Sequence, residues 1–178
     1  MISPAMREIE ACDPSRHLVG FEHRLKGQDR LKDKVAAQLL AQPDLTSAQA
    51  IVTVKDAVRF TFQYNDAHYV AGFYADSERL RARGFEQVEL RNSWTDAQYR
   101  GINSRWREPD TGFTFEVQFH TQVSFEAKQL THAAYERIRD PVTTRGERRD
   151  LEILQEGLTG EVPVPPGATD IKDYPQRR

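Results

Sequence analysis

Hydrophobic and polar residues alternate strictly along the segment FTFEVQFHT. Its odd positions are Phe113, Phe115, Val117 and Phe119, and its even positions are Thr114, Glu116, Gln118 and His120. Because neighbouring side chains of a β-strand point to opposite faces, this pattern predicts a strand with one apolar and one polar face. A carboxylate, an amide and an imidazole in a row are unusual on a solvated strand face. They are therefore candidates for a functional site.

The pattern along the rest of the chain predicts a mixed order of helices and strands. Helices are expected within 1–20 (a short helix and a loop), and at 28–42, 66–83, 124–139 and 145–157. Strands are expected at 51–64 and 85–94, both rich in β-branched and aromatic residues. The segment INSRWRE and the alternating strand are separated by a turn through Asp110 and Gly112, which predicts a β-hairpin.

This order indicates an α+β protein with a mixed β-sheet of about five strands, flanked by helices that lie mostly on one face. We expect a single domain over 1–178, with a core at about 20–157 and a proline-rich tail at 158–178. The sequence contains no internal repeat and no low-complexity linker.

Composition narrows the classes of function. The 25 Lys and Arg residues against 27 Asp and Glu give a net charge of -2. This balance argues against a protein that mainly coats nucleic acid, because such binding requires the neutralisation of many phosphates. The one cysteine, Cys12, allows neither an internal disulfide nor a cysteine-based metal cluster. No apolar run approaches membrane-spanning length, and the first residues lack the apolar core of a signal peptide.

A basic cluster lies at the start of the first long predicted helix. Arg24 and Lys26 precede this helix, and Arg30 and Lys34 lie four residues apart in its first turns. Such a cluster suits an oligophosphate, because the free N–H groups and the dipole of a helix start add to the side chains. Taken alone, however, the cluster favours a solvated basic face with Asp29 among its neighbours.

Asp56 shares its parity with the apolar residues of the predicted strand 51–64. A carboxylate on an apolar face is costly unless it is paired or binds a metal. Asp56 either pairs with Arg59 or Lys55, or lies at a strand end or a bulge. Glu116 can bind Mg²⁺ or accept a proton from a hydroxyl group. Asp56 and Glu116 on neighbouring strands would form a minimal magnesium site.

The segment QYRGINS places an aromatic ring and a cation on a flexible turn. Tyr99 could stack on a nucleobase, with Arg100 beside it, although a loop tyrosine that packs on its own sheet is at least as common. Neither a Walker loop nor a GxGxxG motif is present.

Together, these motifs resemble the synthetase domain of the RelA/SpoT superfamily, over roughly residues 20–140. Those enzymes transfer pyrophosphate from ATP to the 3′-hydroxyl of a purine nucleotide. The matching residues are Arg24-x-Lys26 with Lys34, Asp56 with Arg59, Tyr99 in QYRGIN, and Glu116-x-Gln118. The finer pattern DAVRFT, YRGINSRW and FEVQFHT resembles most the stand-alone, secreted or toxin-like branch, which includes the extracellular nucleotide 3′-pyrophosphokinases of streptomycetes.

The resemblance implies a nucleotidyltransferase-like synthetase fold and roles for individual residues. The implied ATP-binding residues are Arg24, Lys26, Arg30, Lys34 and Arg59, and the implied acceptor-binding residues are Tyr99, Asn103, Gln118 and His120. Asp56 and Glu116 would bind Mg²⁺, and Glu116, Asp56 and Arg24 would be catalytic. Asn103 stands where many members have histidine, and His120 where many have arginine, so a broad range of purine acceptors is expected.

Two other functions remain open. One is pyrophosphorylation of RNA 3′ ends by a toxin, which the net acidity makes less favourable. The other is a catalytically inactive module that binds nucleotides. ATP and a purine nucleotide are the expected partners, and neither a membrane nor DNA is. The resemblance favours a secreted protein whose signal segment lies outside this sequence, with a cytoplasmic location as the alternative.

Overall fold

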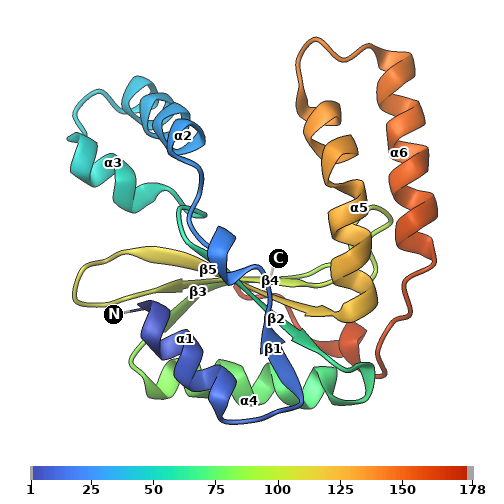
Figure 1. Ribbon diagram of the computed structural model, residues 1–178. Helices are drawn as coiled ribbons and strands as arrows, with labels where there is room; N and C mark the ends of the chain where they lie inside the picture. Colours follow the sequence, from blue (N-terminus) through green and yellow to red (C-terminus); the bar gives the residue numbers. More distant parts are fainter. Residues whose placement is uncertain (1, 176–178) are drawn as a thin grey trace.

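A five-stranded mixed β-sheet forms the centre of the molecule (Figure 1). The computed structural model describes residues 2–175, apart from the side chain of Thr53. In spatial order the strands are β1 (Arg16–Leu18), β2 (Arg59–Tyr64), β5 (Thr114–Thr121), β4 (Ile102–Arg107) and β3 (Glu86–Asn92). The pair β2–β5 is parallel and the other three pairs are antiparallel. The predicted mixed sheet and the predicted β4–β5 hairpin are confirmed.

Helices lie on both sides of the sheet. The helices are α1 (Ile2–Ala11), α2 (Gln28–Ala41), α3 (Ser47–Thr53), α4 (Tyr69–Ala82), α5 (Gln122–Arg139) and α6 (Arg145–Gly160). In Figure 1, α1 and α4 lie below the sheet, whereas the α2–α3 and α5–α6 pairs extend above it. Four of the six described helices thus lie on one side of the sheet, as predicted, and α1 and α4 cover its apolar face.

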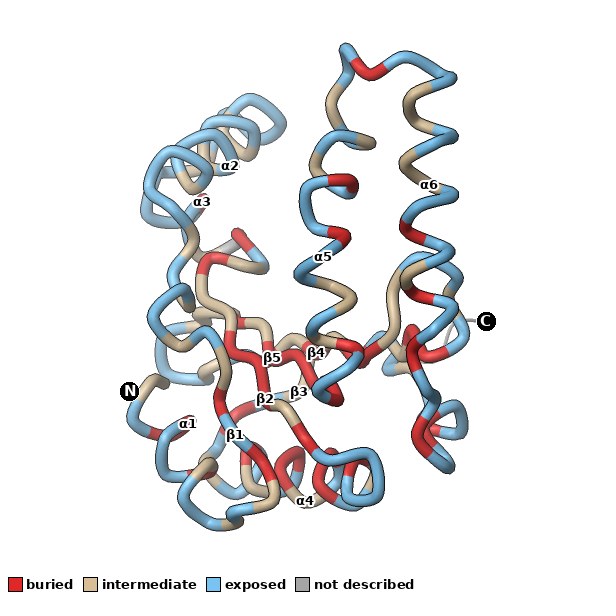
Figure 2. The backbone as a smooth tube through the Cα atoms, turned by 45° about the vertical axis from the view of Figure 1, so that its right-hand side comes forward, coloured by how far each residue is buried: buried red, intermediate tan, exposed pale blue. Residues whose placement is uncertain are grey.

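The hydrophobic core lies between the sheet and the α1–α4 layer. Phe115, Val117 and Phe119 of β5 have no exposed surface, as their alternation predicts. Met6 of α1 and Tyr69 of α4 are also fully buried and belong to the same core cluster. Figure 2 shows buried positions along the central strands and α4, while α2 contains no buried residue. The α2 helix is thus held away from the core.

The segment 51–64 differs from the prediction of one long strand. Its first residues belong to α3, and β2 begins only at Arg59. A capping box starts α3, since Thr46 accepts from the Gln49 backbone and Gln49 accepts from the Thr46 backbone. The short strand β1 was not predicted within 1–20. It pairs antiparallel with β2, where Arg16 lies opposite Tyr64.

Both ends of the described chain extend the core beyond the predicted bounds of 20–157. Ile9 in α1 and Ala168 and Ile171 in the tail belong to the core cluster. The tail docks on the outer strand β3, where Leu90 and Tyr174 exchange backbone hydrogen bonds of 2.7 and 3.0 Å. None of the described helices is long and apolar enough to cross a membrane.

Candidate active site

Polar side chains from three adjacent strands meet on the face of the sheet opposite the core. In the parallel pairing of β2 and β5, Arg59 lies beside Glu116. On the other side of β5, Arg105 of β4 lies opposite Glu116 and Asn103 lies opposite Gln118. The polar positions that alternate with the phenylalanines therefore form one continuous surface across the centre of the sheet.

Asp56 lies in the turn between α3 and β2, where three cations approach it. Its carboxylate is 2.6 Å from Lys34 Nζ, 2.9 Å from Lys26 Nζ and 3.6 Å from Arg59 Nη2. Because β2 begins after Asp56, the carboxylate does not share the apolar face of the strand. Burial raises its pKa, but the bonds from Lys34 and Lys26 outweigh this and hold the pKa below its ordinary value. Asp56 is therefore ionised at neutral pH.

Backbone pairing places the basic cluster beside Asp56. The Lys26 amide donates to the Ala57 carbonyl at 2.9 Å, and the Arg59 amide donates to the Arg24 carbonyl at 2.8 Å. The segment before α2 thus runs along the start of β2. The first turns of α2, with Lys34, follow directly from this anchored segment.

Arg59 links the two carboxylates for which a metal role was predicted. Its Nε donates to Glu116 Oε2 at 2.6 Å, while Nη2 lies near Asp56. Burial would lower the pKa of Arg59, but the negative charge of Glu116 raises it overall. A single guanidinium therefore stays charged between Asp56 and Glu116.

The oxygen donors of Asp56 and Glu116 fit a magnesium ion. Within residues 2–175 no group of three or more His, Cys, Asp or Glu side chains is arranged to hold a metal. Asp56 and Glu116, which both contact Arg59, supply two carboxylates. This is the usual provision for Mg²⁺, which keeps several waters and takes its remaining ligands from substrate phosphates.

The four residues predicted to bind the acceptor form one hydrogen-bonded network with Glu116. Gln118 Nε2 donates to Glu116 Oε1 at 3.0 Å and to Asn103 Oδ1 at 2.9 Å. The Tyr99 hydroxyl donates to Asn103 Oδ1 at 2.8 Å and lies 2.8 Å from His120 Nε2. The sequence prediction thus selected residues that the fold brings together.

The far end of this network is enclosed. His120 has no exposed surface, and burial followed by the charge of Lys128 lowers its pKa, so the ring is neutral. Burial and the charge of Glu116 raise the pKa of Tyr99, which keeps its proton. A Cβ at Gly101 would lie 2.7 Å from the His120 ring, and the φ of Gly101 is +152°. Only glycine allows this close approach.

Two predicted ATP-binding residues point elsewhere. Arg24 donates to Ser3 Oγ at 3.2 Å and to the Phe21 carbonyl at 3.1 Å, and its guanidinium covers the Phe21 ring. Arg30 forms an ion pair of 2.6 Å with Glu136 on α5. Neither side chain contacts Asp56 or Glu116 in this arrangement, because each already has partners on another element.

Lys128 of α5 is a site residue that the sequence reasoning missed. Its Nζ donates to Gln118 Oε1 at 2.6 Å. The available signal was the spacing of polar residues after the strand: Ser124, Lys128, His132 and Glu136 each follow four residues after the previous one, starting from His120. Such a series continues along one face of a helix.

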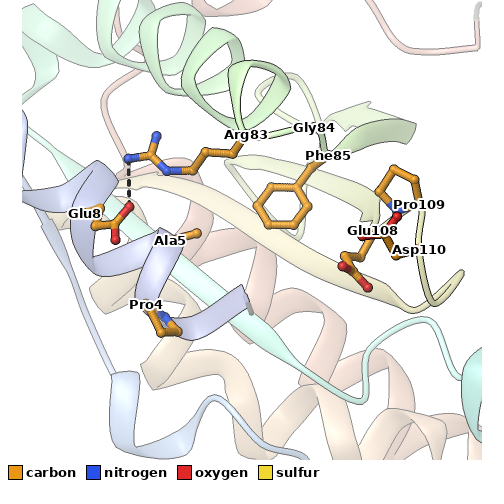
Figure 3. A pocket seen from close by; sticks show the side chains of 9 residues that line it. All are labelled: Pro4, Ala5, Glu8, Arg83, Gly84, Phe85, Glu108, Pro109 and Asp110. Carbon is orange, nitrogen blue, oxygen red and sulfur yellow. Dashed lines mark hydrogen bonds and ion pairs between the residues drawn. The ribbon is translucent and has the colours of Figure 1, made fainter.

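A hollow of about 450 Å³ lies away from this network, between α1, the end of α4 and the β4–β5 turn (Figure 3). Glu8, Glu108 and Asp110 line it together with Arg83. Arg83 is 3.3 Å from Glu8, and the pair is drawn in Figure 3. Its surplus of carboxylates does not suit phosphate.

Comparisons with known proteins agree with this geometry at the level of the fold. No protein-family model and no curated protein matches the sequence. Among solved structures, a GTP pyrophosphokinase family protein from Streptococcus pneumoniae superposes with a TM-score of 0.59, at 15% identity, covering 91% of each chain. The small alarmone synthetase 1 from Bacillus subtilis superposes with a TM-score of 0.56, at 16% identity, covering 89% of this chain and 83% of that one.

A further structure of the Bacillus subtilis synthetase 1 is described as bound to its product pppGpp. It superposes with a TM-score of 0.53, at 14% identity, covering 89% of each chain. These superpositions span nearly all of the chain at low sequence identity. The chain therefore has the fold of the small alarmone synthetases.

Proposed function

We propose that the protein transfers pyrophosphate from ATP to the 3′-hydroxyl of a purine nucleotide and releases AMP. The observation that carries this proposal is the linkage of Asp56 and Glu116 by Arg59, with Lys26 and Lys34 beside Asp56. Two carboxylates and three cations in one site suit an oligophosphate with Mg²⁺. The likeness to a synthetase bound to pppGpp supports a nucleotide substrate.

The donor half of the site would bind the phosphates of ATP. Lys26, Lys34 and Arg59 would turn from the carboxylates to the phosphate oxygens and offset the charge that grows during transfer. When bound by Asp56 and Glu116, Mg²⁺ would neutralise phosphate charge and align the phosphates. Holding the donor in line with the attacking group is the main task of these side chains.

The acceptor half would present the 3′-hydroxyl. Glu116 would accept the hydroxyl proton as the oxygen attacks the β-phosphorus of ATP, and that proton then passes to solvent. A bond forms between the 3′-oxygen and the β-phosphorus, and the bond from this phosphorus to the α–β bridging oxygen breaks. AMP leaves with that oxygen. Tyr99 would stack on the base, while Gln118 and Asn103 would orient the ribose.

A broad range of purine acceptors is part of the proposal. Asn103 offers a neutral amide to the acceptor, and the predicted acceptor residue His120 is fully buried behind Tyr99 with an uncharged ring, so it acts only through Tyr99. Neutral groups that are already hydrogen-bonded to Tyr99 discriminate less between guanine and adenine than a dedicated charged partner would.

The decisive experiment is an incubation with Mg²⁺, ATP and either GTP, GDP or excess ATP, followed by anion-exchange separation. We expect AMP together with a nucleotide that carries two extra phosphates on its 3′-oxygen. Glu116→Gln should lower the rate by at least about 100-fold, because the proton acceptor is lost, while ATP still binds.

Glu126→Gln is the matched control, since Glu126 is an exposed residue of α5 whose partner is Gln122. It should turn over normally. Normal turnover by Glu116→Gln would refute the assigned site, and absence of AMP with every acceptor would refute the activity.

A further inference from the structure

Lys128 reaches the polar row of β5, formed by Glu116, Gln118 and His120, from the helix that follows this strand. The α5 helix begins directly after β5 and packs against β5 and β2. From its second turn, Lys128 extends its ammonium group to Gln118, with the Phe125 ring 5.2 Å away. The side chain is therefore aimed at the sheet and the site, not at solvent.

The charge of Lys128 lacks the carboxylate partner that the cations beside Asp56 and Glu116 have. Lys26 and Lys34 pair with Asp56, Arg59 pairs with Glu116, Arg91 pairs with Asp96, and Arg105 pairs with Glu89. In the part of the chain that the structure describes, Lys128 forms no ion pair, and its hydrogen-bond acceptor is a neutral amide oxygen.

This unmatched charge is unfavourable in the free protein. Burial and the charge of Arg59 lower the pKa of Lys128 to about 8, although the charge of Glu116 acts in the opposite direction. A partly buried cation of this kind gains most from an anion supplied by a ligand. The missing counter-charge therefore points to an anionic group of the substrate.

The position of Lys128 selects the acceptor as the source of that group. Glu116 and Gln118 lie two residues apart on β5. Glu116 lies between Gln118 and the cations around Asp56. Gln118 belongs to the network of Asn103 and Tyr99, on the acceptor side. An acceptor whose 3′-hydroxyl lies at Glu116 carries its phosphate on the other side of its ribose.

We infer that Lys128 binds a 5′-phosphate of the acceptor nucleotide, so that the site selects nucleotides over nucleosides. That the ligand is an acceptor nucleotide rests on the proposed function. That Lys128 contacts its phosphate rests on the unpaired ammonium group beside Gln118. Lys128 is in this sense a specificity-determining residue.

Calorimetric titration of the protein with GDP, GMP and guanosine, in the absence of ATP, tests this assignment. Lys128→Met should weaken the binding of GDP and GMP about tenfold or more, as expected for loss of a charge-assisted contact. Guanosine binding should stay unchanged. Lys128→Arg keeps the charge and should bind GDP within about threefold of the unmodified protein. Lys172→Met, at an exposed lysine in the tail, is the control and should change nothing.

The other outcomes overturn the inference. Equal weakening of GDP and guanosine would mean that Lys128 only positions Gln118. A higher KM for ATP with unchanged GDP binding would mean that Lys128 contacts the donor. Thermal unfolding of each variant identifies a folding defect, in which case Lys128→Arg alone decides. If the unmodified protein binds GDP but forms no AMP, the proposed function fails. The effect of Lys128→Met on GDP binding, compared with guanosine binding, still tests the role of Lys128.

Discussion

At the scale of single residues, two cations approach the polar row of β5 in opposite electrostatic situations. Arg59 lies against Glu116 and near Asp56, and its pKa is raised. Lys128 lies against an amide, and its pKa is lowered to about 8. Arg59 thus stabilises the substrate-free fold. Lys128 destabilises it, and a bound anion would offset this destabilisation.

Removal of this cation should therefore stabilise the protein. We expect Lys128→Met to raise the free energy of unfolding by about 1 to 2 kcal/mol at pH 7, after allowance for its partial exposure to solvent. The folded state binds the lysine proton less tightly than the unfolded state. The charged Lys128 therefore lowers the free energy of unfolding by its full amount below pH 8. As pH rises from about 8 towards 10.5, this destabilisation and the advantage of methionine both shrink.

Urea unfolding at pH 7 and at pH 10 measures this difference. Arg59 and Glu116 are the charged groups that face Lys128, and both are present in the variant as well, so the difference between the two proteins reports on the lysine. An equal free energy of unfolding for Lys128→Met and the unmodified protein at pH 7 would contradict the prediction.

At the scale of elements, the sequence predicted those segments in which one face packs into the core and so imposes a regular apolar pattern. The alternation in β5 found Glu116, Gln118 and His120, because one side of that strand must fill the core. The segment 51–58 was misassigned because its β-branched residues favour a strand, while the capping box at Thr46 and the buried Val54 hold a helix and a turn there. Lys128 was missed, because its contact with Gln118 depends on how α5 folds back over β5.

The ion pair between Arg30 and Glu136 joins α2, which carries Lys34 of the donor half, to α5, which carries Lys128. Arg30 lowers the pKa of Glu136 through its hydrogen bond, so the carboxylate is ionised and competes with phosphate for the guanidinium. We expect Glu136→Gln to bind ATP about threefold more tightly, because Arg30 is released for the donor.

Titration calorimetry with ATP checks this expectation, and Arg30→Ala serves as the opposite variant, which should bind ATP more weakly. Both variants should unfold at nearly the same urea concentration as the unmodified protein, because an exposed ion pair contributes little to stability. Weaker ATP binding by Glu136→Gln would exclude Arg30 from the donor site.

At the scale of the whole molecule, the two faces of the sheet have separate tasks. The face towards α1 and α4 is filled with aromatic side chains, and the opposite face carries the site. A buried ion pair anchors the first of these faces, because Arg16 of β1 and Asp76 of α4 are both fully buried. The Tyr64 hydroxyl also donates to Asp76, at 2.7 Å. These contacts connect β1, β2 and α4.

Breaking this pair should destabilise the entire fold without touching the site. Asp76→Asn removes the fully buried counter-charge of Arg16, which keeps, as a carboxylate partner in the described chain, only the partly exposed Asp13 at 3.2 Å, and we expect the free energy of unfolding to fall by about 3 to 5 kcal/mol. Asp66→Asn, at an exposed aspartate close in sequence, should change it by less than about 0.5 kcal/mol. Urea unfolding of both variants gives the comparison. A loss below 1 kcal/mol for Asp76→Asn would show that the pair contributes little.

The docking of the tail on β3 has a consequence for synthesis of the protein. Leu90 is translated early, but its partner Tyr174 follows 84 positions later in the sequence. At about 5 to 20 residues per second, β3 waits roughly 4 to 17 seconds on the ribosome for this partner. During that interval its outer backbone groups are open to other nascent chains. Leu90 gains its partner only when the tail emerges, so premature termination leaves this part of the β3 edge open to association.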